Sequence, residues 1–190
     1  MQTISQLLPQ EERLAVSNEQ QYLKIGLPKE RTFQEKRICL TPDEVAVLVT
    51  NGHQILVEAG AGEEAHFPDA DYSEAGAEIV YDTEAVFACP MVLKVEPPTT
   101  EELAYFNPQT VLLSALQLNT QDIAYFEMLT QKQITALAFE YIKDEAENYP
   151  IQQSVDELTG IAAVLTASEL ITEENRLLFG NITGVPPIEV

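Results

Sequence analysis

Short apolar runs alternate along the chain with segments in which apolar residues recur every three to four positions. The runs predict strands at residues 23–27, 55–57, 79–80, 91–95, 111–113 and 135–139. The periodic segments predict helices at residues 42–51, 68–75, 83–88, 100–105 and 120–131, and a longer amphipathic helix at about 155–170. This alternation predicts an α/β fold, a doubly wound and mostly parallel sheet with helices on both faces, of Rossmann or flavodoxin type.

The helix that follows Thr41 has the clearest boundaries. Thr41 suits the N-cap, Pro42 suits the first helical position and Glu44 completes a capping box. Gly52 is the expected C-terminal stop. Thr120 is predicted to cap the helix at residues 120–131.

The domain organisation is predicted from the two ends of the chain. Residues 1–21 are polar and rich in Gln and Glu, which indicates an N-terminal arm without a core of its own. Residues 22–180 are expected to form one domain. Residues 181–190 contain Gly184, Pro186 and Pro187 and indicate a linker. The chain stops as another strand would begin, so we expect it to be a piece of a longer protein.

The charge excludes several classes of partner. The chain has 31 acidic and 10 basic residues and a net charge of -21, which disfavours nucleic acid and anionic membranes. No stretch approaches eighteen apolar residues, so no membrane span is predicted. The first residues lack the basic start and apolar block of a secretory signal, and we expect a cytoplasmic protein.

Neither a metal site nor a phosphate-binding loop is predicted. Cys39 and Cys89 lie in apolar contexts and are expected to be reduced core residues, and the histidines His53 and His66 are isolated, which fits neither a disulfide framework nor a zinc site. The glycines at residues 60 and 62 lack the third glycine and the following helix of a dinucleotide fingerprint, so this segment is interpreted as a plain turn.

Lys94 is the leading candidate for a functional residue. It is the only Lys or Arg between Arg37 and Lys132, and it closes an apolar run. A buried lysine is costly unless its charge is used. The alternative is a lysine whose ammonium reaches water or a neighbouring carboxylate.

A second candidate lies among five basic residues within fourteen positions: Lys24, Lys29, Arg31, Lys36 and Arg37. Most of these are expected to be solvated, but Arg37 could clamp a carboxylate. Ligands of doubly wound sheets bind beyond the carboxyl ends of the strands, where Glu30, Lys94, Gln117 and Glu140 are also expected. A small 2-oxo acid could be held there, with Arg37 on its carboxylate and Lys94 polarising its carbonyl.

Several motifs resemble the N-terminal domain of the alanine dehydrogenase and nicotinamide nucleotide transhydrogenase (alpha subunit) family. They are residues 24–30 (KIGLPKE), 36–42 (KRICLTP), 57–62 (VEAGAG), 72–80, 92–95 (VLKV), 134–136 and 184–187 (GVPP), in the family's order. The resemblance covers about residues 23–190. It implies that residues 181–190 lead to an NAD-binding domain located after Val190.

The resemblance also implies roles for individual residues. Arg37 matches the arginine that binds the substrate carboxylate, and Lys94 matches the lysine that contacts the substrate and assists hydride transfer. Gln117 stands where alanine dehydrogenases have an acid/base histidine, and glutamine cannot exchange a proton near neutral pH. The cofactor implied is NAD or NADP, bound outside this chain, and no metal is implied.

Four functions follow as alternatives. The leading one is the substrate-side domain of an enzyme that converts L-alanine to pyruvate and ammonia, active as a longer homo-oligomeric protein and inactive as this fragment. The others are a transhydrogenase alpha-subunit domain, a relative of the saccharopine and lysine-pathway dehydrogenases, and a binding module that has lost catalysis. The partner in the leading case is a small amino acid or 2-oxo acid.

Overall fold

The computed structural model describes residues 22–175, so the predicted arm (1–21) and linker (181–190) lie outside the described residues. Within them, six strands form one sheet in the order β3-β2-β1-β4-β5-β6, and every neighbouring pair is parallel. The strands are β1 Lys24–Leu27, β2 Gln54–Glu58, β3 Glu78–Val80, β4 Met91–Leu93, β5 Val111–Ser114 and β6 Thr135–Ala138. The predicted fold class is confirmed, and the sheet is entirely parallel.

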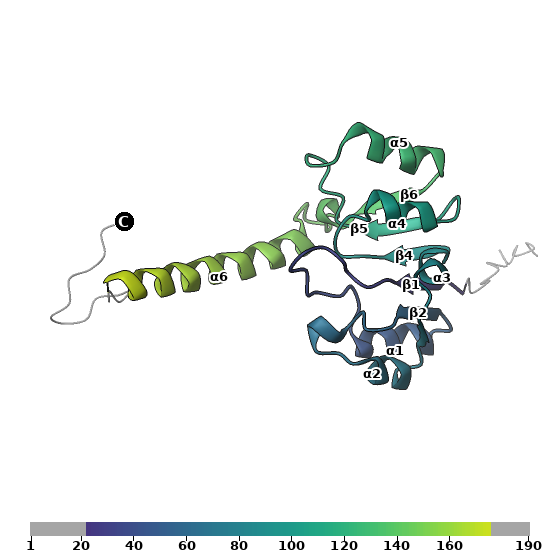
Figure 1. The fold of residues 1–190 in the computed structure, drawn as a ribbon, viewed down its shortest axis with the longest axis horizontal. Coiled ribbons are helices and arrows are strands. Elements are labelled where there is room, and N and C mark those ends of the chain that lie inside the picture. Colours follow the sequence, from purple (N-terminus) through teal and green to yellow (C-terminus); the bar gives the residue numbers. More distant parts are fainter. Residues whose placement is uncertain (1–21, 176–190) are drawn as a thin grey trace, which may run out of the picture.

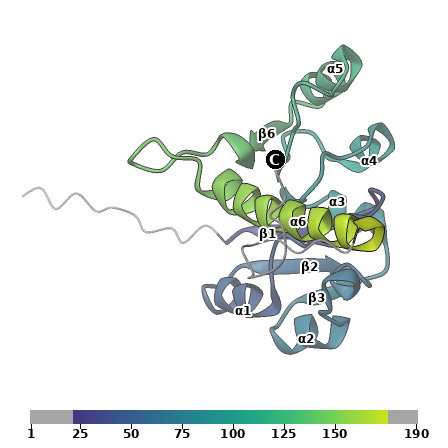
Figure 2. The same cartoon turned by 90° about the vertical axis from the view of Figure 1, so that its left-hand side faces the viewer.

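Helices cover both faces of the sheet (Figures 1 and 2). On one face lie α1 Pro42–Thr50 and α2 Asp69–Glu74, and on the other lie α3 Thr83–Phe87, α4 Thr100–Tyr105 and α5 Ile123–Gln131. Two 3-10 turns, η1 Glu63–Ala65 and η2 Phe139–Tyr141, follow β2 and β6, and α6 spans Pro150–Asn175. Each of the first five helices links two parallel strands.

The alternation of side chains along the strands builds two cores. Ile55 and Val57 face α1 and α2, whereas Leu56 between them faces the α3–α5 side. Val92 and Leu112 join Leu56 on that second side. Because both faces are covered, the strands contain apolar residues at consecutive positions, as parallel strands do.

Gly26 allows α3 to approach β1 closely. A Cβ on Gly26 would lie 2.2 Å from the carbonyl oxygen of Val86 at the C-terminal end of α3. Gly52, predicted as the stop of α1, has a φ of +92°, which side chains rarely adopt. Glu44 accepts hydrogen bonds from the Thr41 backbone N–H at 2.7 Å and from its hydroxyl at 3.0 Å, so the predicted start of α1 is also confirmed.

The start of α5 differs from the prediction. The N-cap is Asp122, whose Oδ1 accepts from the Tyr125 backbone N–H at 2.9 Å. The hydroxyl of Thr120 instead donates to the carbonyl oxygen of Gln117 at 2.8 Å. The Thr120 hydroxyl is used in the turn that follows Gln117, so Asp122, two residues later, caps the helix.

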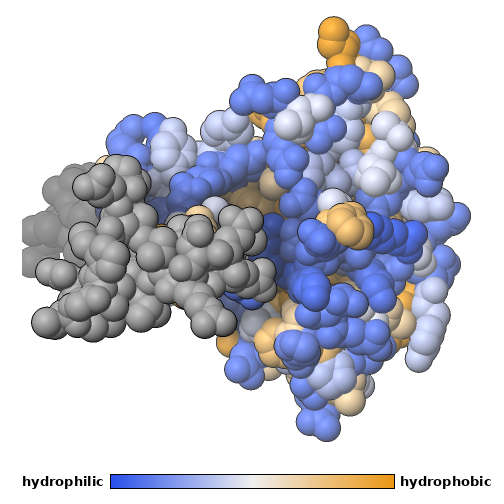
Figure 3. Space-filling view, turned by 60° about the vertical axis from the view of Figure 1, so that its left-hand side comes forward, coloured by the Kyte–Doolittle hydropathy of each residue, from blue (hydrophilic) through white to orange (hydrophobic). Residues whose placement is uncertain are grey.

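The last helix is longer than predicted. It begins at Pro150, a favoured first helical residue, five residues before the expected start. It contacts η2 at its first turns and then projects from the domain (Figures 1 and 2). On the side from which it projects, the visible surface is mostly hydrophilic (Figure 3), in line with the acidic composition. No helix among the described residues is long and apolar enough to span a membrane.

We predict that Gly26→Ala lowers the free energy of unfolding by about 3 kcal/mol, because the added methyl group must push α3 away from the sheet. Urea denaturation of the whole chain measures this. The control is Gly160→Ala on α6, where a Cβ meets nothing within 4 Å. Equal effects of the two substitutions would show that the approach of α3 does not require glycine.

Candidate functional site

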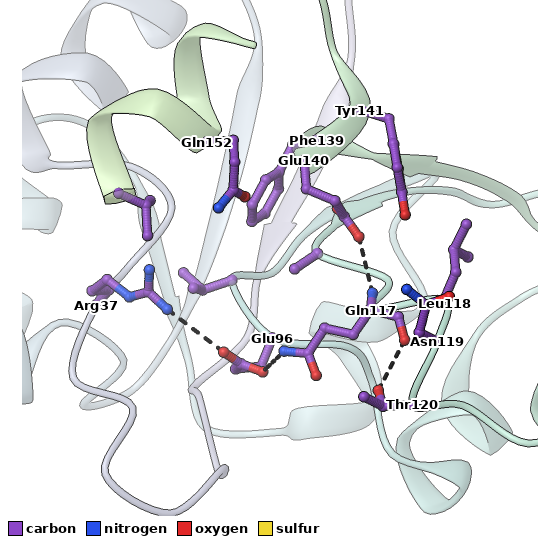
Figure 4. A pocket seen from close by; sticks show the side chains of 13 residues that line it. Arg37, Glu96, Gln117, Leu118, Asn119, Thr120, Phe139, Glu140, Tyr141 and Gln152 are labelled. Atoms are coloured by element: carbon purple, nitrogen blue, oxygen red, sulfur yellow. Dashed lines mark hydrogen bonds and ion pairs between the residues drawn. The ribbon is translucent and has the colours of Figure 1, made fainter. Parts of the chain in front are cut away.

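The segments that follow four strands surround one cavity at the carboxyl edge of the sheet. Its volume is about 330 Å³. Arg37 comes from the segment after β1, Glu96 from after β4, Gln117 from after β5 and Glu140 from η2 after β6, while Gln152 of α6 closes one side (Figure 4). The cavity therefore lies where ligands of parallel sheets bind.

Arg37 is held by two carboxylates. Its Nε and Nη2 donate to the two oxygens of Glu35 at 2.8 and 2.6 Å, a bidentate pair. Its Nη2 also lies 3.5 Å from Oε1 of Glu96. The hydrogen bond to Glu35 is the main reason that the pKa of Arg37 is raised, and the same bond lowers the pKa of Glu35. The Arg37 side chain remains half exposed at the cavity.

Gln117 is held in place by its backbone. Its φ is +47°, and its N–H and that of Leu116 both donate to Oε1 of Glu140 at 2.9 Å. Its side-chain Nε2 donates to Oε2 of Glu96 at 2.7 Å (Figure 4). The left-handed backbone thus turns the Gln117 amide toward the same carboxylate that Arg37 approaches.

Lys94 directly follows β4 and is 1% exposed. Its Nζ lies 2.7 Å from Oε2 of Glu30 and 3.7 Å from Oε2 of Glu102. Glu30 also accepts from the Val95 backbone N–H. Burial raises the pKa of Glu30, and the charge of Lys94 opposes that rise. The sequence left open whether the Lys94 ammonium serves a ligand or reaches water or a neighbouring carboxylate. In the structure it contacts neighbouring carboxylates.

The structure brings two of the three predicted site residues together. Arg37 and Gln117 line the cavity, and Lys94 belongs to a separate buried ion pair. Burial raises the pKa of the nearby Cys39 to about 12, so this thiol is not ionised at neutral pH. Among residues 22–175 there is no group of three or more His, Cys, Asp and Glu side chains that could hold a metal ion.

Comparison with known proteins places this geometry in a family. The family model described as "Alanine dehydrogenase/PNT, N-terminal domain" matches residues 26–165. The chain belongs to this family. It is 34% identical to Alanine dehydrogenase 2 of Staphylococcus aureus over 167 residues. This alignment covers 86% of this chain and 45% of that protein.

Solved structures of the family show the same fold. An L-alanine dehydrogenase superposes with a TM-score of 0.81 at 30% identity, over 87% of this chain and 46% of that one. A transhydrogenase from Sinorhizobium meliloti superposes with a TM-score of 0.57 at 25% identity, over 63% and 35% of the two chains. The chain therefore spans a little less than half the length of these alanine dehydrogenases.

Sequence reasoning missed two acidic residues at the site. Glu96 bridges Arg37 and Gln117, and Glu102 of α4 is 3% exposed beside Lys94. Glu102 also caps its own helix, since it accepts from the Thr99 backbone N–H at 2.8 Å. A signal for Glu96 was available, because it lies two residues after the candidate lysine. That the Glu96 side chain points toward Arg37 depends on tertiary structure and could not be predicted from the sequence.

The described residues do not fit a dinucleotide. In dinucleotide-binding sheets the turn after the first strand is short, rich in glycine and leads into a helix that holds the pyrophosphate. Here residues 28–41 follow β1, and they contain no glycine. The glycines at residues 60 and 62 lead into η1, which begins with Glu63 and Glu64. Neither segment therefore provides the glycine-rich turn and following helix N-terminus that hold a pyrophosphate.

We predict that Lys94→Met lowers the free energy of unfolding by about 3 to 5 kcal/mol, because two buried carboxylates lose their cation. Adding Glu30→Gln to Lys94→Met should recover part of this loss. Urea denaturation at pH 7 measures both. The control is Lys143→Met, which removes a solvent-exposed pair with Glu147 and should change nothing measurable. A loss for Lys94→Met no larger than for Lys143→Met would contradict the importance of the buried pair.

The Glu35–Arg37 pair should make stability depend on pH. The pKa of Glu35 is lowered from its ordinary value of about 4.5, so its contribution is fully present above pH 4.5 and is lost as the pH falls through the lowered pKa. The difference in unfolding free energy between the wild type and Glu35→Gln should therefore shrink on acidification. Denaturation curves between pH 7 and 3 test this, and a difference that stays constant would refute it.

Proposed function

We propose that this domain holds the small amino acid or 2-oxo acid of an alanine dehydrogenase-type oxidoreductase, which converts L-alanine to pyruvate and ammonia in the longer protein. The observation that carries the proposal is the convergence of Arg37 and Gln117 on one cavity at the carboxyl edge, in a chain of this family. Arg37 offers a cation, and Gln117 offers a neutral hydrogen-bond donor. Both suit a small carboxylic acid.

We assign different tasks to the three site residues. Arg37 binds the substrate carboxylate through its exposed side, and Gln117 orients the substrate by hydrogen bonding without exchanging a proton. Lys94 polarises the carbonyl oxygen. For Lys94 to do so, its ammonium must turn from Glu30 toward the cavity, which the next two residues, Val95 and Glu96, line.

The hydride acceptor in this proposal is NAD or NADP, held outside the described residues. We place its site in a further domain after residues 181–190, which act as the linker, with residues 1–21 as an arm. The fragment alone is then inactive with alanine and NAD. We also propose a homo-oligomer located in the cytoplasm. Only the family resemblance supports these statements.

A transhydrogenase domain is the second candidate. Gln117 favours it, because glutamine cannot supply the acid/base step for which the resemblance implies a histidine in alanine dehydrogenases. The greater similarity to alanine dehydrogenases in identity, coverage and TM-score favours the first candidate. Alanine-dependent formation of NADH by the longer protein would separate the two.

We predict that Arg37→Gln weakens the binding of pyruvate to the full chain at least tenfold, because a charge-assisted hydrogen bond is lost. Chemical shift changes in NMR spectra during a pyruvate titration measure the dissociation constant. The matched control is Arg31→Gln, since Arg31 lies in the same segment and is similarly exposed but pairs with Glu58 and Thr83. Equal affinities of the two variants would contradict the proposed role of Arg37.

A further inference from the structure

The carboxylate of Glu96 contacts two side chains, those of Arg37 and Gln117, to which the proposed function assigns substrate binding. Gln117 donates to its Oε2 at 2.7 Å, and Nη2 of Arg37 lies 3.5 Å from its Oε1 (Figure 4). The two side chains come from different segments, after β5 and after β1. A cation and an amide that approach separate oxygens of one carboxylate form the arrangement by which proteins recognise carboxylic acids.

The other contacts of Arg37 and Gln117 show that neither needs Glu96 for its position. Glu35 already binds two nitrogens of Arg37 in a bidentate pair. The backbone of Gln117 is fixed by Glu140. Glu96 itself is 16% exposed and lines the cavity. Its carboxylate can therefore leave both partners without removing the contacts that orient them.

The local charge gives this contact a consequence for binding. Each of the two cations here faces two carboxylates: Arg37 faces Glu35 and Glu96, and Lys94 faces Glu30 and Glu102. An incoming anion would add a further negative charge to this group. The negative charge of the anion and those of the carboxylates beside Arg37 would repel each other strongly, because they are partly buried.

We propose that the Glu96 carboxylate occupies the place of the substrate carboxylate and makes Glu96 a specificity-determining residue that disfavours 2-oxo acids relative to amino acids. This inference rests on the proposed function. A 2-oxo acid such as pyruvate brings only a negative charge and must displace Glu96. L-alanine also brings an ammonium group, which compensates the displaced carboxylate, so its binding suffers less.

The test compares the binding of pyruvate and L-alanine to the full chain by NMR titration. Glu96→Gln keeps the shape of the side chain and removes its charge. We expect it to tighten pyruvate binding about tenfold and L-alanine binding about twofold or less, so that the ratio of the two dissociation constants changes. A purely structural role of Glu96 would not change this ratio. The matched control is Glu74→Gln, which removes an exposed charge on α2 at the β3 end of the sheet and should leave both affinities unchanged.

A second measurement uses the wild type alone. Pyruvate should shift the side-chain amide resonances of Gln117 toward their positions in Glu96→Gln, because the hydrogen bond from Gln117 to Glu96 breaks. Spectra and thermal unfolding of Glu96→Gln show whether the variant is folded. If it is not, Glu96→Ala and the wild-type resonance shift decide the question.

The outcomes separate the inference from the function on which it rests. Wild type that binds pyruvate while Glu96→Gln binds it equally or more weakly would overturn the inference and leave the proposed function standing. An unchanged ratio of the two affinities, or pyruvate binding without movement of the Gln117 resonances, would do the same. Failure of the folded wild type and the folded Glu96→Gln to bind either compound would remove the proposed function, and the inference with it.

Discussion

The ion pair between Lys94 and Glu30 is the contact on which the carboxyl edge of the sheet depends. Lys94 is almost fully buried, and a buried ammonium requires opposite charge close by. Glu30 supplies that charge from the segment after β1 and also accepts from the Val95 backbone. The segment that contains Arg37 is thereby anchored to the end of β4. The Lys94–Glu30 pair therefore helps to position Arg37 at the cavity, although Lys94 itself does not line the cavity.

The topology of the sheet explains why the site forms at this edge. The order β3-β2-β1-β4-β5-β6 means that the chain leaves β1 toward one side and returns from β3 to the other side through α3. The loops after β1 and β4 therefore diverge, and a crevice opens between them. Arg37 and Glu96 come from these two loops. A sheet of dinucleotide-binding order thus places a cation, Arg37, beside a carboxylate, Glu96, in this crevice, and such a pair of opposite charges suits a small zwitterion.

The sequence pattern predicts those parts of the molecule that local physics determines. The strands, the capping box of α1 and the stop at Gly52 each depend on residues close in sequence, and the structure confirms them. Burial of Lys94 could also be predicted, because the surrounding residues are apolar. Local sequence does not decide whether Thr120 or Asp122 is the N-cap of α5, since both residue types can cap a helix. The choice depends on the hydrogen bond from Thr120 to the Gln117 carbonyl.

The site was predicted less completely for a physical reason. A family resemblance identifies residues that bind a substrate, but the contacts that those residues make without it depend on neighbours from distant segments. Lys94 meets Glu30 across 64 positions of sequence, and Gln117 meets Glu96 across 21. In a chain with three times as many acidic as basic residues, each cation at the site is already paired with carboxylates. On the proposal that the substrate displaces Glu96, binding is an exchange of one carboxylate for another, and its free energy depends on the carboxylate that leaves as much as on the cation that receives the ligand.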